Sequence, residues 1–152
     1  MRKINLLLVF ALVFATQISA QESTTYTKNG VAIPVRTTPS NTLIELISSD
    51  SIFNFNIAVA TFPKGQKLAW HSHPGGQILV ITEGVGYYQE RGKPKQVVRK
   101  GEVIKCLPGV EHWHGASAET GVSYMATYST QKGVTIWLLP VTDAEYNSEA
   151  KL

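Results

Sequence analysis

All four histidines of this 152-residue chain fall into two His-x-His pairs, His71 with His73 and His112 with His114. Side chains two residues apart in an extended strand point to the same face of a sheet, so each pair presents two imidazoles to one side. Gln77 has the parity of the first pair and faces the same way if the chain stays roughly extended past the Pro-Gly-Gly turn. Closing a sheet into a barrel can bring both pairs together. The spacing therefore predicts a metal site built from imidazoles and one amide oxygen.

The donor types indicate which metals such a site would bind. Three neutral imidazoles and an oxygen donor suit Mn, Fe, Co, Ni, Cu or Zn far better than Mg or Ca. The alternative is that surface or core histidines cluster without a ligand. The two pairs account for the whole histidine content of the chain, which favours metal binding.

The elements that must position these residues read as strands. From residue 41 onward, short apolar or alternating runs are separated by Gly, Pro and Asn, which is typical of a β-sandwich or barrel. No alternation of strands with helices appears, so a parallel sheet is not expected. The predicted strands are 43–48, 53–62, 77–83, 86–90, 95–98, 102–107, 112–116, 122–128 and 134–138. A capping-box sequence at 142–145 predicts a short terminal helix from Asp143 to about Lys151.

The N-terminus has the layout of a secretory signal peptide over residues 1–20. Arg2 and Lys3 precede an unbroken apolar run, and Ser19-Ala20 offers small residues for cleavage. The alternative is a retained membrane anchor. It is disfavoured because the run is too short to span a bilayer as a stable helix. We expect a secreted or periplasmic protein with an N-terminal arm over 21–40 holding one short strand, and one domain over 41–152.

Charge and cysteine content exclude some classes of partner. Removing residues 1–20 lowers Lys+Arg from 14 to 12 against 11 Asp+Glu, so the mature net charge is 12 − 11 = +1. No basic patch predicts nucleic-acid binding. Cys106 is the only cysteine, so no internal disulfide can form. We expect a small-molecule substrate, no nucleic acid, and no membrane association after signal removal.

Two runs resemble a known family. The run WHSHPGGQ at 70–77, followed by Gly84, resembles the first cupin motif, in which two histidines and an acidic or amide residue ligate metal. The run GEVIKCLPGVEH at 101–112 resembles the second motif, which supplies a third histidine. The resemblance covers about residues 52–139. It implies an all-β, cupin-type jelly-roll β-barrel, often a homodimer, with a metal in the barrel mouth.

A finer resemblance involves the runs HPGGQ, HWHGA and VTDAEY. They are similar to a cupin subgroup found alone or fused to carboxymuconolactone-decarboxylase-like domains, which includes manganese-dependent hydroxynitrile lyases. This resemblance implies one divalent transition metal, manganese first and Fe, Ni, Cu or Zn as alternatives. By match to the motif, its ligands are His71, His73, Gln77 and His112.

The resemblance also bears on the proton acceptor. Gln77 stands where the family commonly has Glu, and a neutral amide leaves more positive charge for an anion or oxyanion. An amide cannot take a proton, so the base must come from elsewhere. His114 is the candidate because it shares a face with His112, and structural hydrogen bonding is its alternative role.

Two tyrosines depart from the lyase pattern. Tyr124 and Tyr128 stand where the lyases have a His and a Gln that face the metal. A phenol is a much weaker base near pH 7. Tyr124 could instead donate a hydrogen bond to a substrate oxygen, whereas Tyr128 at least equally suits barrel lining.

These observations lead to one leading hypothesis and two alternatives. The first is an exported, metal-dependent enzyme of lyase or isomerase type, hydroxynitrile-lyase-like, with the metal as Lewis acid and His114, with or without Tyr124, moving a proton. The alternatives are an oxygen-using cupin with Fe or Cu, and a non-catalytic binder of a metal or small ligand. Trp70 and Trp113 have the opposite parity and should pack outside the site. The cavity should be lined by Phe55, Ile57, Leu79, Ile104 and Tyr124.

Overall fold

The structure is a computed structural model that describes residues 26–28, 31–33, 35–38 and 40–151. The predicted signal peptide, residues 1–20, lies outside the described residues. Almost all regular structure is β. The elements are β1 (Tyr26–Lys28), β2 (Val31–Ile33), β3 (Val35–Thr37), β4 (Thr42–Ile47), β5 (Phe55–Phe62), β6 (His71–Ser72), β7 (Gln77–Glu90), β8 (Lys95–Arg99), β9 (Val103–Cys106), β10 (His112–Ala116), β11 (Val122–Ser129), β12 (Ile136–Trp137), α1 (Asp143–Asn147) and β13 (Ala150–Lys151).

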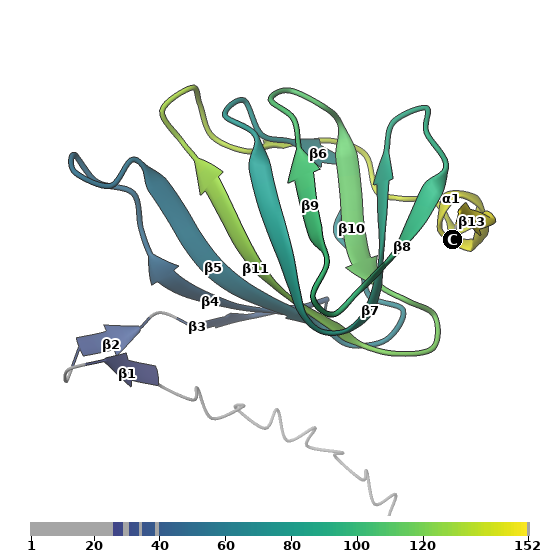
Figure 1. The fold of residues 1–152 in the computed structure, drawn as a ribbon, viewed down its shortest axis with the longest axis horizontal. Helices are drawn as coiled ribbons and strands as arrows, with labels where there is room; N and C mark the ends of the chain where they lie inside the picture. Colours follow the sequence, from purple (N-terminus) through teal and green to yellow (C-terminus); the bar gives the residue numbers. More distant parts are fainter. Residues whose placement is uncertain (1–25, 29–30, 34, 39, 152) are drawn as a thin grey trace, which may run out of the picture.

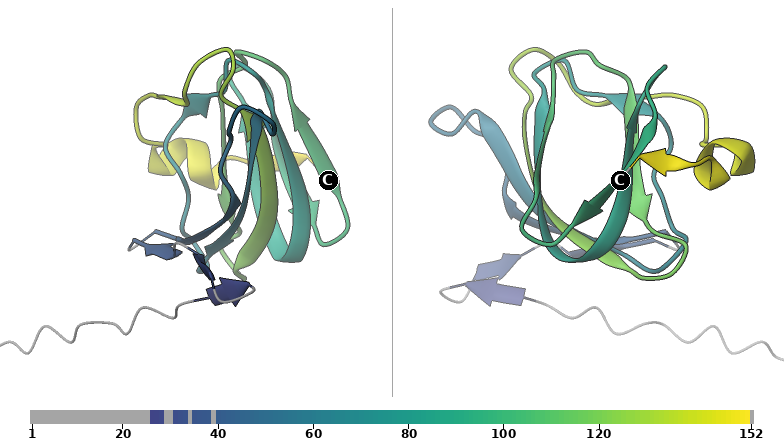
Figure 2. Two further views of the ribbon diagram at one scale, coloured as in Figure 1. Left: turned by 90° about the vertical axis from the view of Figure 1, so that its left-hand side faces the viewer. Right: turned by 45° about the vertical axis from the view of Figure 1, so that its right-hand side comes forward.

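One large sheet curls into two walls that face each other (Figures 1 and 2). Its order is β12-β6-β10-β7-β11-β5-β4-β3, with β8 and β9 also paired to β7 and β13 paired to β8. All pairings are antiparallel except that of β13 with β8. The first half of β7 pairs with β11 and β9, and its second half pairs with β10 and β8. Strand β7 therefore belongs to both walls.

The continuity of β7 differs from the prediction of two strands, 77–83 and 86–90. Gly84 lies within the strand at φ +74°, and a Cβ there would lie 2.0 Å from the carbonyl oxygen of Gly121. A glycine inside a strand can mark a bend where two backbones approach closely. Here it lets one strand turn from one wall to the other.

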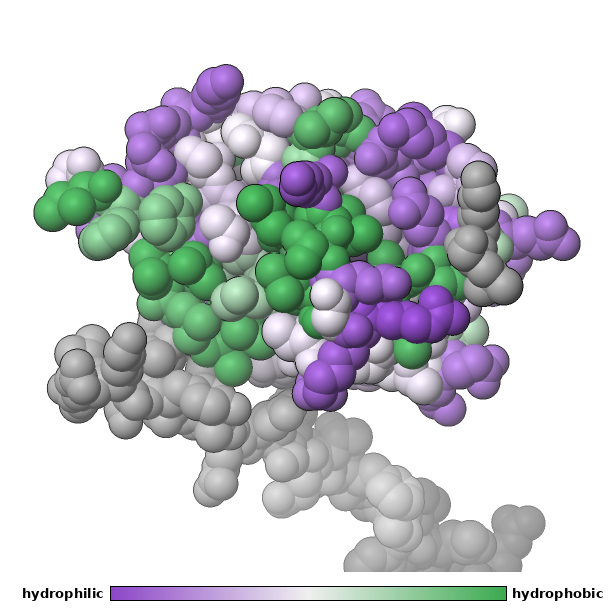
Figure 3. All heavy atoms as spheres, in the orientation of Figure 1, coloured by the Kyte–Doolittle hydropathy of each residue, from purple (hydrophilic) through white to green (hydrophobic). Residues whose placement is uncertain are grey.

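The interior between the walls is filled by an apolar cluster. Its buried members are Ala60, Phe62, Leu79, Ile81, Tyr88, Val98, Cys106, Ala116, Val122, Tyr124 and Ala126. Apolar side chains also lie outside this interior: Ile78, Val103 and Leu107 are exposed. Figure 3 shows hydrophobic side chains gathered in the middle of one face of the molecule.

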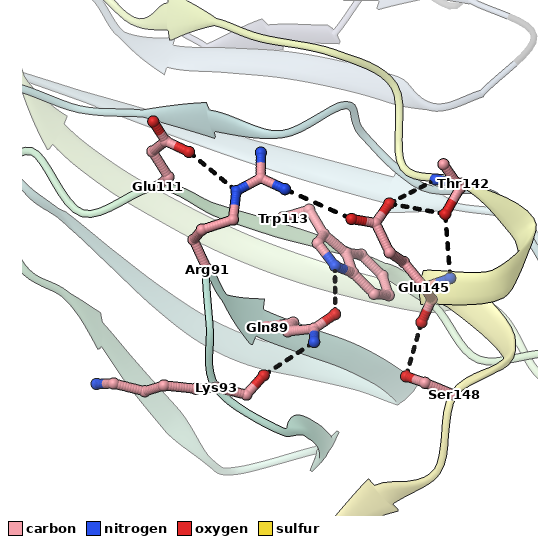
Figure 4. Close-up of polar contacts among 8 residues, drawn as sticks. All are labelled: Gln89, Arg91, Lys93, Glu111, Trp113, Thr142, Glu145 and Ser148. Carbon is pink, nitrogen blue, oxygen red and sulfur yellow. Dashed lines mark hydrogen bonds and ion pairs between the residues drawn. The ribbon is translucent and has the colours of Figure 1, made fainter.

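A second cluster joins α1 to the outside of the β6–β10 wall. Trp70 and Trp113 pack there with Val141 and Tyr146, so the prediction that both tryptophans lie outside the site is confirmed. Figure 4 shows the polar contacts around Trp113: Arg91 pairs with Glu111 and with Glu145, and Trp113 Nε1 donates to Gln89 Oε1.

The C-terminal helix is shorter than predicted. Thr142 and Glu145 form the expected capping box, but α1 ends at Asn147 and the chain continues as β13. Ala150 and Lys151 pair in parallel with Lys95 and Gln96 of β8. These two residues therefore form a strand that pairs with β8 and do not extend the helix.

The N-terminal arm contains three short strands rather than one. Strands β1 and β2 pair with each other, and β3 pairs with β4, which joins the arm to the large sheet. Within the described part of the chain, no helix is long and apolar enough to cross a membrane.

Candidate metal centre

Three histidines from two neighbouring strands converge inside the curled sheet. His71 on β6 is the register partner of His112 on β10, and His73 follows directly after β6. One ring nitrogen from each lies within 4.8 Å of the others, and all three side chains are buried. This group could hold a metal ion. The two pairs thus meet because β6 and β10 are adjacent in the sheet.

Gln77 brings an oxygen to the same group. It is the first residue of β7, and its Oε1 lies 3.3 Å from His112 Nε2. The Cys106 thiol contacts the same oxygen at 3.9 Å. Burial raises the pKa of Cys106 to about 12, so it is a neutral thiol near neutral pH when no metal is bound. The fourth predicted ligand is therefore in place beside the three imidazoles.

The outer nitrogen of each imidazole has an acceptor within hydrogen-bond distance. His71 Nδ1 lies 2.8 Å from the carbonyl oxygen of Ala69, and His112 Nδ1 lies 3.0 Å from that of Val110. A carbonyl oxygen only accepts, so each Nδ1 carries the hydrogen and Nε2 keeps its lone pair. His73 Nδ1 lies 3.2 Å from the hydroxyl of a threonine, Thr135.

The protonation of the cluster also fits a metal. The pKa is lowered to about 3 for His71 and to about 4 for His73. Burial is the largest cause in both, and the neighbouring His112 lowers both values further. Burial lowers the pKa of His112 as well. All three are neutral near pH 7, which is the state that binds metal. Among the residues that the structure describes, nothing forms a hydrogen bond with the buried His73 Nε2, which suits a nitrogen that binds metal. The residues present therefore fit a divalent transition metal.

His114 differs from the other three histidines. It is buried, and neither of its ring nitrogens has a hydrogen-bond partner within the described part of the chain. Its ring packs against Tyr124 and His71, each at 5.2 Å between centroids. Burial, and then repulsion by the other histidines, holds its pKa well below the ordinary value. His114 is thus a buried, neutral imidazole beside the ligand group.

A cavity of about 250 Å³ opens beside the cluster. Trp137 and Tyr128 form aromatic walls, with ring centroids 4.9 Å from His71 and 5.1 Å from His73, respectively. The described residues that line it are Thr38, Asn41, Leu43, Ala60, Leu68, His71, His73, Gln77, His114, Ala126, Tyr128, Thr135 and Trp137. The volume lies just below the range of roughly 300–1,000 Å³ that is typical of small-molecule sites, which suits a small substrate.

The predicted cavity lining was wrong. Phe55 and Ile57 lie on the outward parity of β5, whose buried residues are Asn56, Ala58, Ala60 and Phe62. Leu79 and Ile104 belong to the apolar cluster and not to the cavity wall.

The structure also places Tyr124 away from the cavity. Its side chain is fully buried and its hydroxyl donates to the carbonyl oxygen of Gly115 at 2.7 Å. Burial raises its pKa above the ordinary value. Tyr124 therefore contacts His114 by packing, while its hydroxyl is engaged with the backbone.

Sequence reasoning missed the contribution of the segment after β11. Thr135 and Trp137 both touch the histidine cluster, although they lie more than sixty residues from His71 and His73. Trp137 reads in sequence as a packing residue. Only the pairing of β12 with β6 brings this segment to the site.

The fold and site define an all-β jelly-roll protein with a candidate three-histidine metal centre in its cavity. The family model described as "Cupin domain" matches residues 58–128. An (R)-mandelonitrile lyase from Granulicella tundricola is 38% identical over 90 residues, which are 59% of this chain and 69% of that protein. The chain belongs to the cupin family, as the two motifs predicted.

Solved structures support the same fold. A cupin-like protein from Thermotoga maritima is similar with a TM-score of 0.67 and 38% identity, covering 70% of this chain and 84% of that one. The lyase DddQ from Ruegeria pomeroyi, named for the substrate DMSP, has a TM-score of 0.61 at 16% identity, with 73% and 64% covered. That second likeness concerns the fold alone. The predicted jelly-roll fold with a short C-terminal helix is confirmed.

Proposed function

We propose that this protein is a metal-dependent lyase that cleaves or forms a cyanohydrin, with manganese as the first candidate metal. The observation that carries the proposal is His114, a buried imidazole that lines the same cavity as the ligand group and whose nitrogens have no hydrogen-bond partner among the described residues. The similarity to an (R)-mandelonitrile lyase supports the choice of reaction.

The ligand group determines what a metal would contribute. His71, His73, Gln77 and His112 would hold it, and when bound it would supply a Lewis acid that stabilises negative charge on a substrate oxygen. All four ligands are neutral, so the full charge of the ion would act on the substrate. This favours a substrate whose oxygen becomes anionic during the reaction.

His114 is the proton acceptor in this proposal. In cyanohydrin cleavage the substrate hydroxyl loses its proton to the neutral His114 imidazole, and the oxygen electron pair forms the carbonyl double bond. The bond between the carbinol carbon and the nitrile carbon breaks, and its electron pair leaves with cyanide. His114 then returns the proton to cyanide, so the products are an aldehyde and hydrogen cyanide. Gln77 cannot take this proton because an amide is not basic.

The cavity walls suit this chemistry. Leu43, Leu68, Ala60 and Ala126 give apolar surface, and Trp137 and Tyr128 add aromatic surface. Such walls exclude water and strengthen electrostatic interactions inside the site. In this proposal Tyr124 orients His114 by packing, since its own hydroxyl is bonded to Gly115.

The test is turnover of (R)-mandelonitrile by protein loaded with Mn²⁺, followed as benzaldehyde formation and corrected for the spontaneous reaction. We expect enantioselective turnover that chelation abolishes. We expect His114→Leu to lower kcat about 10²–10⁴-fold, the usual contribution of a general base, with metal content unchanged. Full metal loading without turnover of any cyanohydrin would contradict the lyase assignment and favour a binding protein. Turnover that requires O₂ would favour an oxygen-using enzyme.

A further inference from the structure

The three ligand histidines are not held in the same way. His71 and His112 each have Nδ1 near the carbonyl oxygen of the residue two positions earlier. These acceptors belong to the backbone and are local to each strand. His73 Nδ1 instead lies near Thr135 Oγ1, a side-chain atom 62 residues further along the chain. One ligand of the cluster therefore depends on a single distant side chain.

The fold holds Thr135 firmly in that position. It directly precedes β12, where Ile136 pairs with Ser72 and Trp137 pairs with His71. Beyond β12, Leu138 N donates to the carbonyl oxygen of Trp70, and Trp70 N donates to that of Leu139. Thr135 thus lies beside His73 because its segment is hydrogen-bonded to β6, and His73 directly follows β6.

The chemistry of imidazole shows what this contact does. A histidine can bind metal through Nε2 only when Nε2 carries a lone pair, so Nδ1 must carry the hydrogen. That hydrogen needs an acceptor, and Thr135 Oγ1 is the atom at hydrogen-bond distance. Among the described residues, nothing forms a hydrogen bond with His73 Nε2. A threonine hydroxyl can accept from Nδ1–H or donate to a bare Nδ1, and only the accepting arrangement leaves the lone pair on Nε2.

We propose that Thr135 is a positioning residue of the metal centre, whose hydroxyl accepts from His73 Nδ1 and so holds His73 Nε2 ready to bind the metal. This inference rests on the metal site of the proposed function. Outer partners of this kind commonly alter metal affinity 10–100-fold when removed. The C-terminal segment would then belong to the metal centre and not only to the cavity wall.

Two substitutions separate the hydroxyl from the shape of the side chain. Thr135→Val keeps the branched shape and removes the hydroxyl, whereas Thr135→Ser keeps the hydroxyl. Thr127→Val on β11 is the matched control, because Thr127 shares the outward parity of Met125 and lines no part of the metal cavity. Dissociation constants for Mn²⁺ and Zn²⁺ would be measured by competition with a chelator. Thermal unfolding of the metal-free variants would verify that each is folded.

We expect Thr135→Val to weaken metal binding about 10–100-fold, and Thr135→Ser and Thr127→Val to leave it within about threefold. A Thr135→Val variant that is folded and binds both metals like the wild type would overturn the proposal.

A second readout does not require metal. Long-range ¹H–¹⁵N NMR spectra of the metal-free protein report which ring nitrogen of His73 carries the hydrogen. We expect Nδ1–H in the wild type and in Thr135→Ser, and a mixture of tautomers in Thr135→Val. A tautomer mixture in the wild type would refute the role of Thr135. If the wild type shows Nδ1–H but binds no metal, the proposed function fails while the tautomer role of Thr135 stands.

Discussion

At the scale of single residues, hydrogen-bond partners distinguish four histidines that look alike in sequence. His71, His73 and His112 each have one ring nitrogen near an acceptor and the other turned to a shared centre. His114 has no hydrogen-bond partner at either nitrogen among the residues placed in the structure. Buried polar atoms without partners are rare, and each one that persists in a folded protein calls for an explanation. The explanation that we propose is that His114 serves a bound molecule and not the fold.

This difference leads to an expectation about stability. Replacing His114 by Leu, a side chain of similar size, removes two unpaired polar atoms from the interior. Leaving a buried polar group unpaired costs about 1–3 kcal/mol, so the metal-free variant should be more stable than the wild type by about that amount. Urea unfolding of both proteins measures the difference. A variant destabilised by a similar amount would show that His114 has a structural role instead.

At the scale of elements, β7 determines how the two walls meet. Its Gly84 combines a positive φ with close contact to the backbone of Gly121, so both conformation and space exclude a side chain there. Gly92 also has a positive φ but has nothing within 4 Å of a built Cβ. Comparing alanine substitutions at the two positions therefore separates the free-energy cost of the left-handed backbone conformation from the cost of a steric clash.

We expect Gly84→Ala to destabilise the protein by at least about 3 kcal/mol, because backbone atoms cannot move aside as a flexible side chain would. Gly92→Ala should cost only about 1 kcal/mol, the penalty of the left-handed conformation. Chemical denaturation of the two variants gives both values. Equal costs would mean that β7 can shift away from Gly121 without loss.

The strands also show where sequence prediction succeeds and fails. Most predicted strands lie within two residues of the observed ones, because Gly and Pro turns separate them clearly. The candidate ligand positions follow from parity and motif alone. The cavity wall does not: on β5 the larger apolar residues, Phe55 and Ile57, face outward, while the cavity is lined by the small Ala60. Hydrophobicity alone does not tell which face of β5 points inward, so the prediction selected the wrong face.

Thr135 could not be found from sequence for a different reason. Its contact with His73 depends on the pairing of β12 with β6, two short strands far apart in the chain. Such pairing is a property of the folded sheet and leaves no local pattern.

At the scale of the whole molecule, four neutral histidines enclosed by two walls make folding sensitive to acid. In the unfolded chain each should titrate near its ordinary pKa of about 6.5. In the folded protein the pKa falls to about 3 for His71 and about 4 for His73, and it is also lowered for His112 and His114. Below the unfolded value the unfolded state therefore binds more protons than the folded state.

Stability of the metal-free protein should consequently fall as the pH falls below about 6.5, and it should go on falling until the pH approaches the folded values. Between about pH 7.5 and 5.5 the loss should be about 1 kcal/mol for each histidine that stays neutral in the folded state. Urea unfolding at several pH values measures how steeply the free energy of unfolding depends on pH. His114→Leu should lower this dependence by the contribution of one histidine. A free energy of unfolding that stays constant across this interval would contradict the lowered pKa values.

Export and assembly stay predictions at this scale. If residues 1–20 are a signal peptide, protein recovered from the native periplasm or medium should begin at Gln21. N-terminal sequencing decides this, and an intact Met1 on exported protein would exclude cleavage.

The homodimer implied by the family resemblance is tested by light scattering on the same material.

The most direct measurement is the metal content of protein purified from its native compartment, determined by elemental analysis beside His112→Ala. His112 joins the two histidine pairs, since it is the register partner of His71 and lies 3.3 Å from Gln77 Oε1. We expect about one divalent transition metal ion per wild-type chain, since one cluster can form one site, and a large loss in the variant. A wild-type protein without stoichiometric metal, or a folded His112→Ala protein that keeps the full metal content, would contradict the metal centre.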